Sequence, residues 1–224
     1  MDDFTFDQST AQDWLNIIEG NTKARDQDVY PMLREWISQC PGTNVLEIGC
    51  GQGVCSNQID LINHTYTGVD PSVFLLERAQ QIYGGPRCRF IAGNAYQLPF
   101  QEGQFDAVFS IAVLHLLSRL DEAVQEMSRV LKPGGHFLLM TAHPHSLELW
   151  RQMYPDSEIN EKCLYGKLQR SDGSLAVDRI YFHSFEEIKL SFKSNGLLIQ
   201  SAKPFRSAEV QQQGFYYVAI EGKK

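Results

Sequence analysis

The stretch VLEIGCGQG, residues 45–53, restricts the fold more than any other part of the chain. An aliphatic run directly precedes three glycines within five positions. Glycine loses more conformational entropy on folding than other residues, so this density is favoured where the backbone turns sharply or a ligand approaches it closely. The pattern therefore predicts a buried strand that ends in a tight strand-to-helix turn next to a ligand.

Strand and helix patterns alternate along most of the chain. The expected strands span residues 44–49, 65–70, 88–93, 105–111, 136–142, 197–205 and 214–222. The expected helices span residues 28–40, 73–83, 120–131 and 184–196, and a further helix starts at about residue 53. Strands that alternate with helices build a parallel sheet. We therefore expect an α/β, doubly wound, Rossmann-like sheet of seven strands, mostly parallel with an antiparallel last strand.

The chain is expected to form a single domain over residues 1–224, because 43% hydrophobic composition at this length can fill one core. Residues 1–40 are expected to form a helical N-terminal cover, in which the amphipathic stretch 11–20 either covers the site or packs as an ordinary core helix. Residues 143–182 separate the fifth strand from the last helix. An insertion of this length above the strand ends predicts a lid that contains a hairpin.

The charge and the cysteine content restrict which partners, metal sites and cellular compartment are expected. The formal net charge is −7, and no long Lys/Arg run occurs. Nucleic acid is therefore disfavoured as a partner, although Lys162, Lys167 and Arg170 hint at a basic strip. The five cysteines are an odd number without a zinc-like spacing, which predicts free thiols in a reducing cytoplasm and no metal site. The N-terminus does not resemble a signal peptide and no apolar run reaches membrane length, so we expect a cytoplasmic protein without membrane contact. The oligomeric state is not predicted.

Two acidic residues flank the glycine turn. Asp70 ends the strand that follows, where a carboxylate accepts hydrogen bonds from ribose hydroxyls in doubly wound folds. Glu47 lies within an aliphatic strand, where its burial is costly unless donors meet it. An ammonium group, or water that links to one, satisfies Glu47, whereas a pyrophosphate is repelled. The Gly-x-Gly-x-Gly spacing also differs from the dinucleotide pattern, so the predicted ligand is a nucleoside with a cationic, amino-acid-like tail.

The chain resembles the class I S-adenosylmethionine-dependent methyltransferases, particularly those that methylate small molecules. The blocks VLEIGCGQG, TGVD, GNAYQLPF, FDAVFSIAVLHLL and VLKPGGHFLL follow one another in the order of that family. The resemblance covers residues 45–139 and extends more loosely to residue 205. It implies S-adenosyl-L-methionine as the cofactor and methyl transfer to an N, O or S atom of a small-molecule acceptor by in-line displacement.

The resemblance also implies which residues contact the cofactor. The first block implies backbone contact with the methionine moiety and places Glu47 near the amino group, and the second places Asp70 on the ribose. Asn94 stands where the family usually has aspartate, and its carbonyl oxygen can accept from the adenine amino group. Arg25 is either a carboxylate ligand or a solvated charge. The complete set is Arg25, Glu47, Gly49, Cys50, Gly51, Gly53, Asp70, Pro71, Ser72, Asn94, Ala95, Ser110, Ile111 and Ala112.

Three histidines are candidates for the acceptor side of the site. His115 follows the fourth strand, and faces the substrate, packs against adenine or caps the following helix. His143 follows the fifth strand, and His183 either reaches the substrate cleft or stabilises the turn before Ser184. The cofactor supplies the reactive group, so a general base is optional. An RNA- or protein-directed methyltransferase and a non-catalytic S-adenosylmethionine-binding regulatory protein remain as alternatives.

Overall fold

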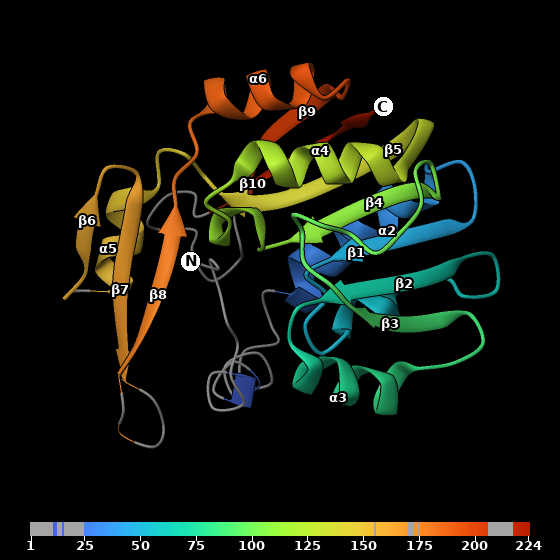
Figure 1. Cartoon of the computed structure of the whole chain (residues 1–224), viewed down its shortest axis with the longest axis horizontal. Helices are drawn as coiled ribbons and strands as arrows, with labels where there is room; N and C mark the ends of the chain where they lie inside the picture. Colours follow the sequence, from blue (N-terminus) through green and yellow to red (C-terminus); the bar gives the residue numbers. More distant parts are fainter. Residues whose placement is uncertain are drawn as a thin grey trace.

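A seven-stranded sheet forms the centre of the protein (Figure 1). The computed structural model describes residues 11–12, 15, 25–154, 156–169, 173, 175–205 and 217–224. The strands lie in the order β3-β2-β1-β4-β5-β10-β9, and their bounds are β1 Asn44–Ile48, β2 Thr65–Asp70, β3 Cys88–Ala92, β4 Phe105–Ile111, β5 Leu131–Ala142, β9 Leu198–Phe205 and β10 Tyr217–Lys223. Strands β1 to β5 pair in parallel, whereas β10 is antiparallel to both of its neighbours. The expected fold class is confirmed.

Side chains that alternate along the strands form one hydrophobic layer on each face of the sheet. The remaining elements of the main body are η1 Arg25–Val29, α2 Tyr30–Ser38, η2 Val54–Gln58, α3 Val73–Tyr83, η3 Leu114–Leu116, α4 Leu120–Val130 and α6 Phe185–Ser194. Val45 of β1 packs in the layer under α2, and the next residue, Leu46, packs in the layer under α4 and α6. β1 is thus buried on both faces, which explains its aliphatic run.

The helix expected from about residue 53 is wrong. The segment Val54–Gln58 forms only a 3₁₀ turn, and the chain becomes extended at Ile59. The Ser56 hydroxyl donates to the Gly53 carbonyl oxygen at 2.6 Å. Serine, asparagine and β-branched valine are weak helix formers, and a hydroxyl that bonds the local backbone competes with a regular helix.

The other predicted boundaries need smaller corrections. α6 begins with the expected capping box, in which the Ser184 hydroxyl and the Glu187 carboxylate each bond the other residue's backbone N–H. β5 starts at Leu131 instead of residue 136, because Leu131 already pairs with Phe105 before a shift in register. The first expected helix begins as a π-helix, η1, and continues as α2.

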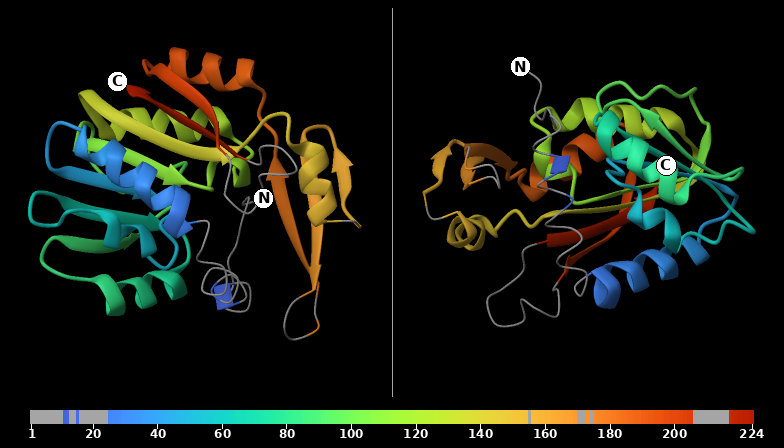
Figure 2. Two further views of the ribbon diagram at one scale, coloured as in Figure 1. Left: turned by 180° about the vertical axis from the view of Figure 1, so that it is seen from behind. Right: turned by 90° about the horizontal axis from the view of Figure 1, so that it is seen from below.

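The segment between β5 and α6 forms a small folded unit beyond the carboxyl ends of β4 and β5 (Figures 1 and 2). It contains α5 (Leu147–Met153) and a three-stranded antiparallel sheet of β6 (Glu158–Asn160), β7 (Cys163–Gln169) and β8 (Leu175–Tyr181). β7 and β8 are the expected hairpin. Its hydrophobic cluster consists of Trp150, Tyr154, Leu164, Ile180 and Phe182 together with Ala142 of the main sheet. This unit is called the lid below.

Only a small part of the expected N-terminal cover lies among the described residues. Ala11 and Leu15 are helical and pack against Leu75 of α3. The rest of residues 1–24 lies outside the described residues, apart from Gln12. None of the helices in the described part of the chain combines the length and the apolar character needed to cross a membrane.

Candidate functional site

The strand order identifies one edge of the sheet as the candidate site. The order β3-β2-β1-β4-β5 reverses its direction between β1 and β4. In open parallel sheets, ligands bind outside the carboxyl ends of the strands at such a switch point. The glycine loop follows β1 and Asp70 ends β2, so both motifs predicted from sequence meet at this edge.

The three glycines of the loop all adopt positive φ. Gly49, Gly51 and Gly53 have φ of 75°, 50° and 78°. A Cβ atom at Gly49 would lie 2.3 Å from Cγ2 of Val113, and one at Gly53 would lie 2.6 Å from Cε1 of Phe90. Close packing inside the protein therefore already requires glycine at positions 49 and 53.

Asp70 fastens the glycine loop to the end of β2. The backbone N–H of Gly51 donates to Oδ2 and that of Ser72 donates to Oδ1, each at 2.9 Å. Burial raises the pKa of this carboxyl, and the two N–H groups partly offset that effect. Each carboxylate oxygen has a second lone pair, so Asp70 retains the capacity to accept from ligand hydroxyls. The Ser72 hydroxyl is engaged as the N-cap of α3.

Glu47 has a partner inside the protein. Its side chain is 2% exposed, and the Tyr66 hydroxyl donates to Oε2. Burial raises the pKa of Glu47 to about 8, although hydrogen bonds from Tyr66 and Cys55 lower it in part. The carboxyl therefore holds a proton over much of the neutral range. Glu47 thus accepts a hydrogen bond inside the protein from Tyr66, a partner that the sequence analysis did not identify because nothing in the sequence links the two residues.

The side chain of Asn94 forms hydrogen bonds within its own turn. Its Oδ1 accepts from the backbone N–H groups of Tyr96 and Gln97, at 2.9 and 3.0 Å. The oxygen expected to accept from adenine already has two donors, so the polar group left for a ligand is the Nδ2 donor. Ala95 beside it is buried.

The end of β4 is held in an unusual backbone conformation. Ala112 has φ of 60°, and its N–H donates to the Met140 carbonyl oxygen at 2.8 Å. The left-handed region is unfavourable for a residue with a Cβ, and such strain is concentrated at functional sites. The Ser110 hydroxyl donates to the Ile48 carbonyl oxygen at 2.8 Å, so it joins β4 to β1 and does not point to solvent.

The other expected cofactor residues are placed as follows. Cys50 is buried, and burial raises the pKa of its thiol well above the ordinary value. Pro71 is exposed and Ile111 is half-buried. The backbone of Arg25 lies in η1, but its side chain lies outside the described residues.

His115 is buried between the main sheet and the lid. Its Nδ1 accepts from the Ala142 N–H at 3.2 Å, so this nitrogen is unprotonated. The ring centroid lies 5.6 Å from that of Trp150 and 5.9 Å from that of Tyr217. Burial, followed by the nearby His183, lowers the pKa of His115 to about 3. These contacts pack His115 between the main sheet and the lid.

His143 and His183 have different surroundings. His143 is half-buried and packs against Phe185, and its Nδ1 accepts from the His145 N–H at 3.2 Å. His183 is 3% exposed, and its Nε2 donates to the Leu117 carbonyl oxygen at 2.8 Å. The Nδ1 of His183 is buried without a hydrogen-bond partner among the described residues. Burial lowers the pKa of both histidines.

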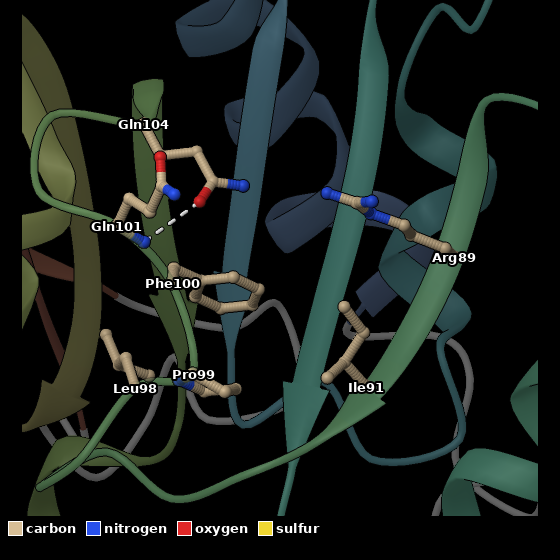
Figure 3. Close-up of a pocket in the computed structure, with 7 residues that line it drawn as sticks. All are labelled: Arg89, Ile91, Leu98, Pro99, Phe100, Gln101 and Gln104. Atoms are coloured by element: carbon tan, nitrogen blue, oxygen red, sulfur yellow. Dashed lines mark hydrogen bonds between the residues drawn. The ribbon is translucent and has the colours of Figure 1, made fainter.

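The described residues enclose two cavities of different size. A small apolar one of about 20 Å³ borders Ala95 and Ser110. A larger groove of about 650 Å³ lies between β3 and the loop before β4 and is lined by Arg89, Ile91, Leu98, Pro99, Phe100, Gln101 and Gln104 (Figure 3). Arg89 donates from Nε to the Thr67 hydroxyl at 3.0 Å. None of the predicted cofactor residues lines this groove.

Two of the three basic residues that suggested a basic strip form ion pairs with glutamates. Lys162 pairs with Glu187 at 2.7 Å, and Lys167 pairs with Glu158 at 3.0 Å. Arg170 lies outside the described residues. No group of three potential metal ligands occurs within the described ranges.

One residue of the glycine loop was missed by sequence reasoning. Gln52 is 4% exposed, and its Nε2 has no hydrogen-bond partner in the described part of the chain. A buried donor without a partner is uncommon, and a ligand that carries an acceptor explains it. This donor and the remaining acceptor capacity of Asp70 both fit an adenosyl compound with an anionic tail.

Comparison with known proteins agrees with this geometry. A family model described as a methyltransferase domain matches residues 46–139. The fatty-acid O-methyltransferase of Mycolicibacterium smegmatis is 35% identical over 124 residues, which cover 53% of this chain and 44% of that protein. The malonyl-[acyl-carrier protein] O-methyltransferase of Erwinia pyrifoliae is 31% identical over 137 residues, which cover 59% of this chain and 52% of that protein. The chain thus spans about half the length of the curated relatives it matches.

The fold comparison is more extensive. The crystal structure of an S-adenosylmethionine-dependent methyltransferase from Methanosarcina mazei matches with a TM-score of 0.71 at 20% identity, covering 88% of this chain and 98% of that chain. The match includes most of the elements outside residues 46–139. The chain therefore shares the fold of this methyltransferase, and its residues 46–139 match the methyltransferase domain model.

Proposed function

We propose that this protein transfers the methyl group of S-adenosylmethionine to an oxygen, nitrogen or sulfur atom of a small-molecule acceptor. The observation that carries the proposal is the bond from the Gly51 N–H to Asp70, which joins the two ligand-facing motifs at the switch point of the sheet. We also propose that residues 1–224 act as one domain, in which residues 1–40 and 143–182 close over the site.

The chemistry needs alignment more than it needs a reactive side chain. Bound S-adenosylmethionine would supply an activated methyl group, and S-adenosylhomocysteine would be the leaving group. Asp70 would orient the ribose hydroxyls, and the glycine loop would allow the backbone to approach the methionine moiety. Holding two reactants in line can lower the barrier by about 7–11 kcal/mol in favourable cases.

An oxygen acceptor on a small acyl compound is the class we favour. Two of the curated relatives are named for O-methylation of fatty acids and of malonyl-[acyl-carrier protein]. A carboxylate acceptor is already ionised at neutral pH and requires no base. The net charge of −7 and the paired lysines of the lid argue against an RNA acceptor.

An alcohol or amine acceptor would need to lose a proton, and His183 is then the best-placed base of the three histidines. Its Nε2 holds the proton against the Leu117 carbonyl, which leaves Nδ1 as the basic nitrogen. In His115 and His143 the Nδ1 atom already accepts a backbone N–H. Replacement of His183 by asparagine is expected to slow transfer to alcohols and amines while leaving carboxylate methylation and cofactor affinity unchanged.

The decisive experiment has two stages. Calorimetric titration of the purified protein with S-adenosylmethionine, S-adenosylhomocysteine and NAD establishes the ligand class. A panel of carboxylates, alcohols, amines and thiols is then assayed for release of S-adenosylhomocysteine. Binding of NAD in the absence of S-adenosylhomocysteine binding would refute the proposal, and cofactor binding without turnover on any acceptor would favour the regulatory alternative.

A further inference from the structure

A loop, instead of a helix, connects β3 to β4. The connections from β2 to β3 and from β4 to β5 contain α3 and α4, whereas residues 93–104 contain no helix. Phe90 of β3 packs in the layer under α2, so its neighbours Arg89 and Ile91 point to the opposite face of the sheet. There they form one wall of the groove of about 650 Å³, and the loop segment 98–104 forms the other (Figure 3). This volume lies within the range of small-molecule sites.

The loop wall of the groove is held in place by α4. The backbone N–H of Leu98 donates to the Glu126 carboxylate at 2.7 Å, and the Arg129 guanidinium donates to the carbonyl oxygens of Phe100 and Leu98 at 2.7 and 3.0 Å. The Phe100 ring also packs edge-on against Phe105, with centroids 5.0 Å apart. The wall is thus ordered before a ligand arrives, which reduces the entropy that binding would otherwise lose.

Hydrogen-bond donors face each other from the two walls. On the β3 side, Nε of Arg89 donates to the Thr67 hydroxyl at 3.0 Å, and the two terminal guanidinium nitrogens have no partner among the described residues. On the loop side, Oε1 of Gln104 accepts from the Gln101 N–H at 3.1 Å, which fixes the amide and leaves Nε2 as a donor. Figure 3 shows the Arg89 guanidinium and the Gln104 amide pointing toward one another across the groove. One acceptor group between them can bond both.

Charge and apolar surface define that acceptor group further. Of the described residues that line the groove, Arg89 alone carries a charge. A carboxylate balances this single charge and matches the paired donors of a guanidinium, whereas a phosphate dianion leaves a negative charge unpaired. Ile91, Pro99 and Phe100 add apolar surface beside the donors (Figure 3). The lining therefore fits one carboxylate on an apolar body.

We propose that this groove is a second ligand site, which binds a monocarboxylate with an apolar chain. The carboxylate lies between the Arg89 guanidinium and the Gln104 amide, and the chain lies against Ile91 and Phe100. The inference goes beyond the proposed methyl transfer, because none of the predicted cofactor residues lines the groove.

The first part of the test asks which features of a ligand are needed. The full chain is titrated by calorimetry with octanoate, with octanamide, which has the same chain without the charge, and with acetate, which has the charge without the chain. Octanoate is expected to bind at least about 10-fold more tightly than either of the others, because the site pairs a charge and also buries apolar surface. The octanoate affinity is expected to be the same with and without S-adenosylhomocysteine.

The second part locates the binding site by substitution. Arg89→Met keeps an apolar stem and removes the guanidinium, so the octanoate affinity is expected to fall by about 10- to 100-fold, as for loss of hydrogen bonds between charged groups. Gln104→Leu is expected to lower it by about 3- to 10-fold, and it leaves the Arg89–Thr67 bond intact if Arg89→Met folds poorly. Arg34→Met is the matched control: it removes the same charge from α2, where Arg34 bonds Gln58, and the affinity is expected to be unchanged.

Several results overturn the inference. One is the failure of octanoate to bind the unaltered protein, and another is equal binding of octanoate and octanamide. An undiminished affinity in both Arg89→Met and Gln104→Leu would place the octanoate elsewhere, such as the acceptor site. A lower sedimentation coefficient of Arg89→Met would show that the groove holds a second copy of the chain. Methyl transfer is not measured in these titrations, so failure of the proposed function leaves their outcome unaffected.

Discussion

The glycine-loop side of the site and the lid side differ in how their polar groups are satisfied. On the loop side, Glu47 and Asp70 are carboxyl groups with specific donors, and backbone N–H groups provide most of the contacts. On the lid side, His115 and His183 are neutral rings buried among aromatic side chains. The backbone contacts on the loop side require glycines at fixed spacing, which leave a sequence motif. The packing contacts on the lid side leave no such motif.

The two sides of the site should differ most in how the free energy of unfolding depends on pH. The variant Glu47→Gln tests this dependence on the glycine-loop side. The pKa of Glu47 is raised from 4.5 to about 8 in the folded protein. Between these values the folded protein retains a proton that the unfolded chain has lost, so this contribution to stability falls as pH rises through the window. Above pH 8, Glu47→Gln is expected to be more stable than the original protein by about 2–5 kcal/mol, with little difference at pH 4.5. Urea unfolding from pH 4.5 to above pH 8 measures this difference in stability between the variant and the original protein.

Glu187 is a matched control, because its pKa shifts on folding in the opposite direction to that of Glu47. Hydrogen bonds from Lys162 and the Ser184 backbone lower the pKa of Glu187 from 4.5 to about 2. Its contribution is therefore present above pH 4.5 and is lost as pH falls toward 2. Glu187→Gln should reduce stability at neutral pH only slightly, because this pair is exposed. A pH profile for Glu47→Gln that parallels the original protein would show that Glu47 is ionised when folded.

On the lid side, the corresponding test is the substitution of His115. His115→Ala leaves the Ala142 N–H without an acceptor and opens a void between Trp150 and Tyr217, so we expect a loss of about 2–4 kcal/mol in unfolding free energy. His115→Asn, whose Oδ1 can replace Nδ1, should recover part of this loss. The His115 pKa falls from 6.5 to about 3 on folding, so the original protein should lose this contribution as pH decreases through that window.

Cofactor affinity distinguishes the two roles of His115. If it packs the lid against the sheet, the affinity for S-adenosylhomocysteine should stay within a few-fold of the original value in both variants. If the variants keep the stability of the original protein but no longer transfer the methyl group, His115 contacts the acceptor instead.

The two sides also differ in what the sequence predicted. The mostly parallel sheet of seven strands follows from alternating strands and helices, and the burial of Glu47 follows from its place in an aliphatic run. Its partner Tyr66 does not follow, because the register between β1 and β2 brings them together. The short 3₁₀ turn after Gly53 depends on a local Ser56 bond that competes with the predicted helix. The contact between His115 and Trp150 joins elements that only the folded lid brings near each other.

Asp70→Ala tests the loop side directly. Removal of the carboxylate takes away the acceptor for ribose hydroxyls and releases the Gly51 N–H, so S-adenosylhomocysteine affinity is expected to fall by about 1–3 kcal/mol. Asp60→Ala serves as the control, since Asp60 is an exposed carboxylate that bonds only its own turn. Calorimetry that gives equal affinities for the original protein and Asp70→Ala would refute the ribose assignment.

The smallest expected effect concerns Ala112, where the two sides meet. Its φ of 60° is unfavourable for alanine by about 1–2 kcal/mol, and glycine adopts it freely. Glycine also gives the unfolded chain more freedom, which offsets about 0.4–1 kcal/mol. Ala112→Gly should therefore change the unfolding free energy by less than about 1 kcal/mol, toward greater stability, whereas Ala112→Val should destabilise because a β-branched side chain resists this conformation. Equal stability of the glycine and valine variants in urea unfolding would show that residue 112 does not hold a left-handed conformation in solution. The end of β4 would then not be the strained junction that separates the cofactor side from the acceptor side.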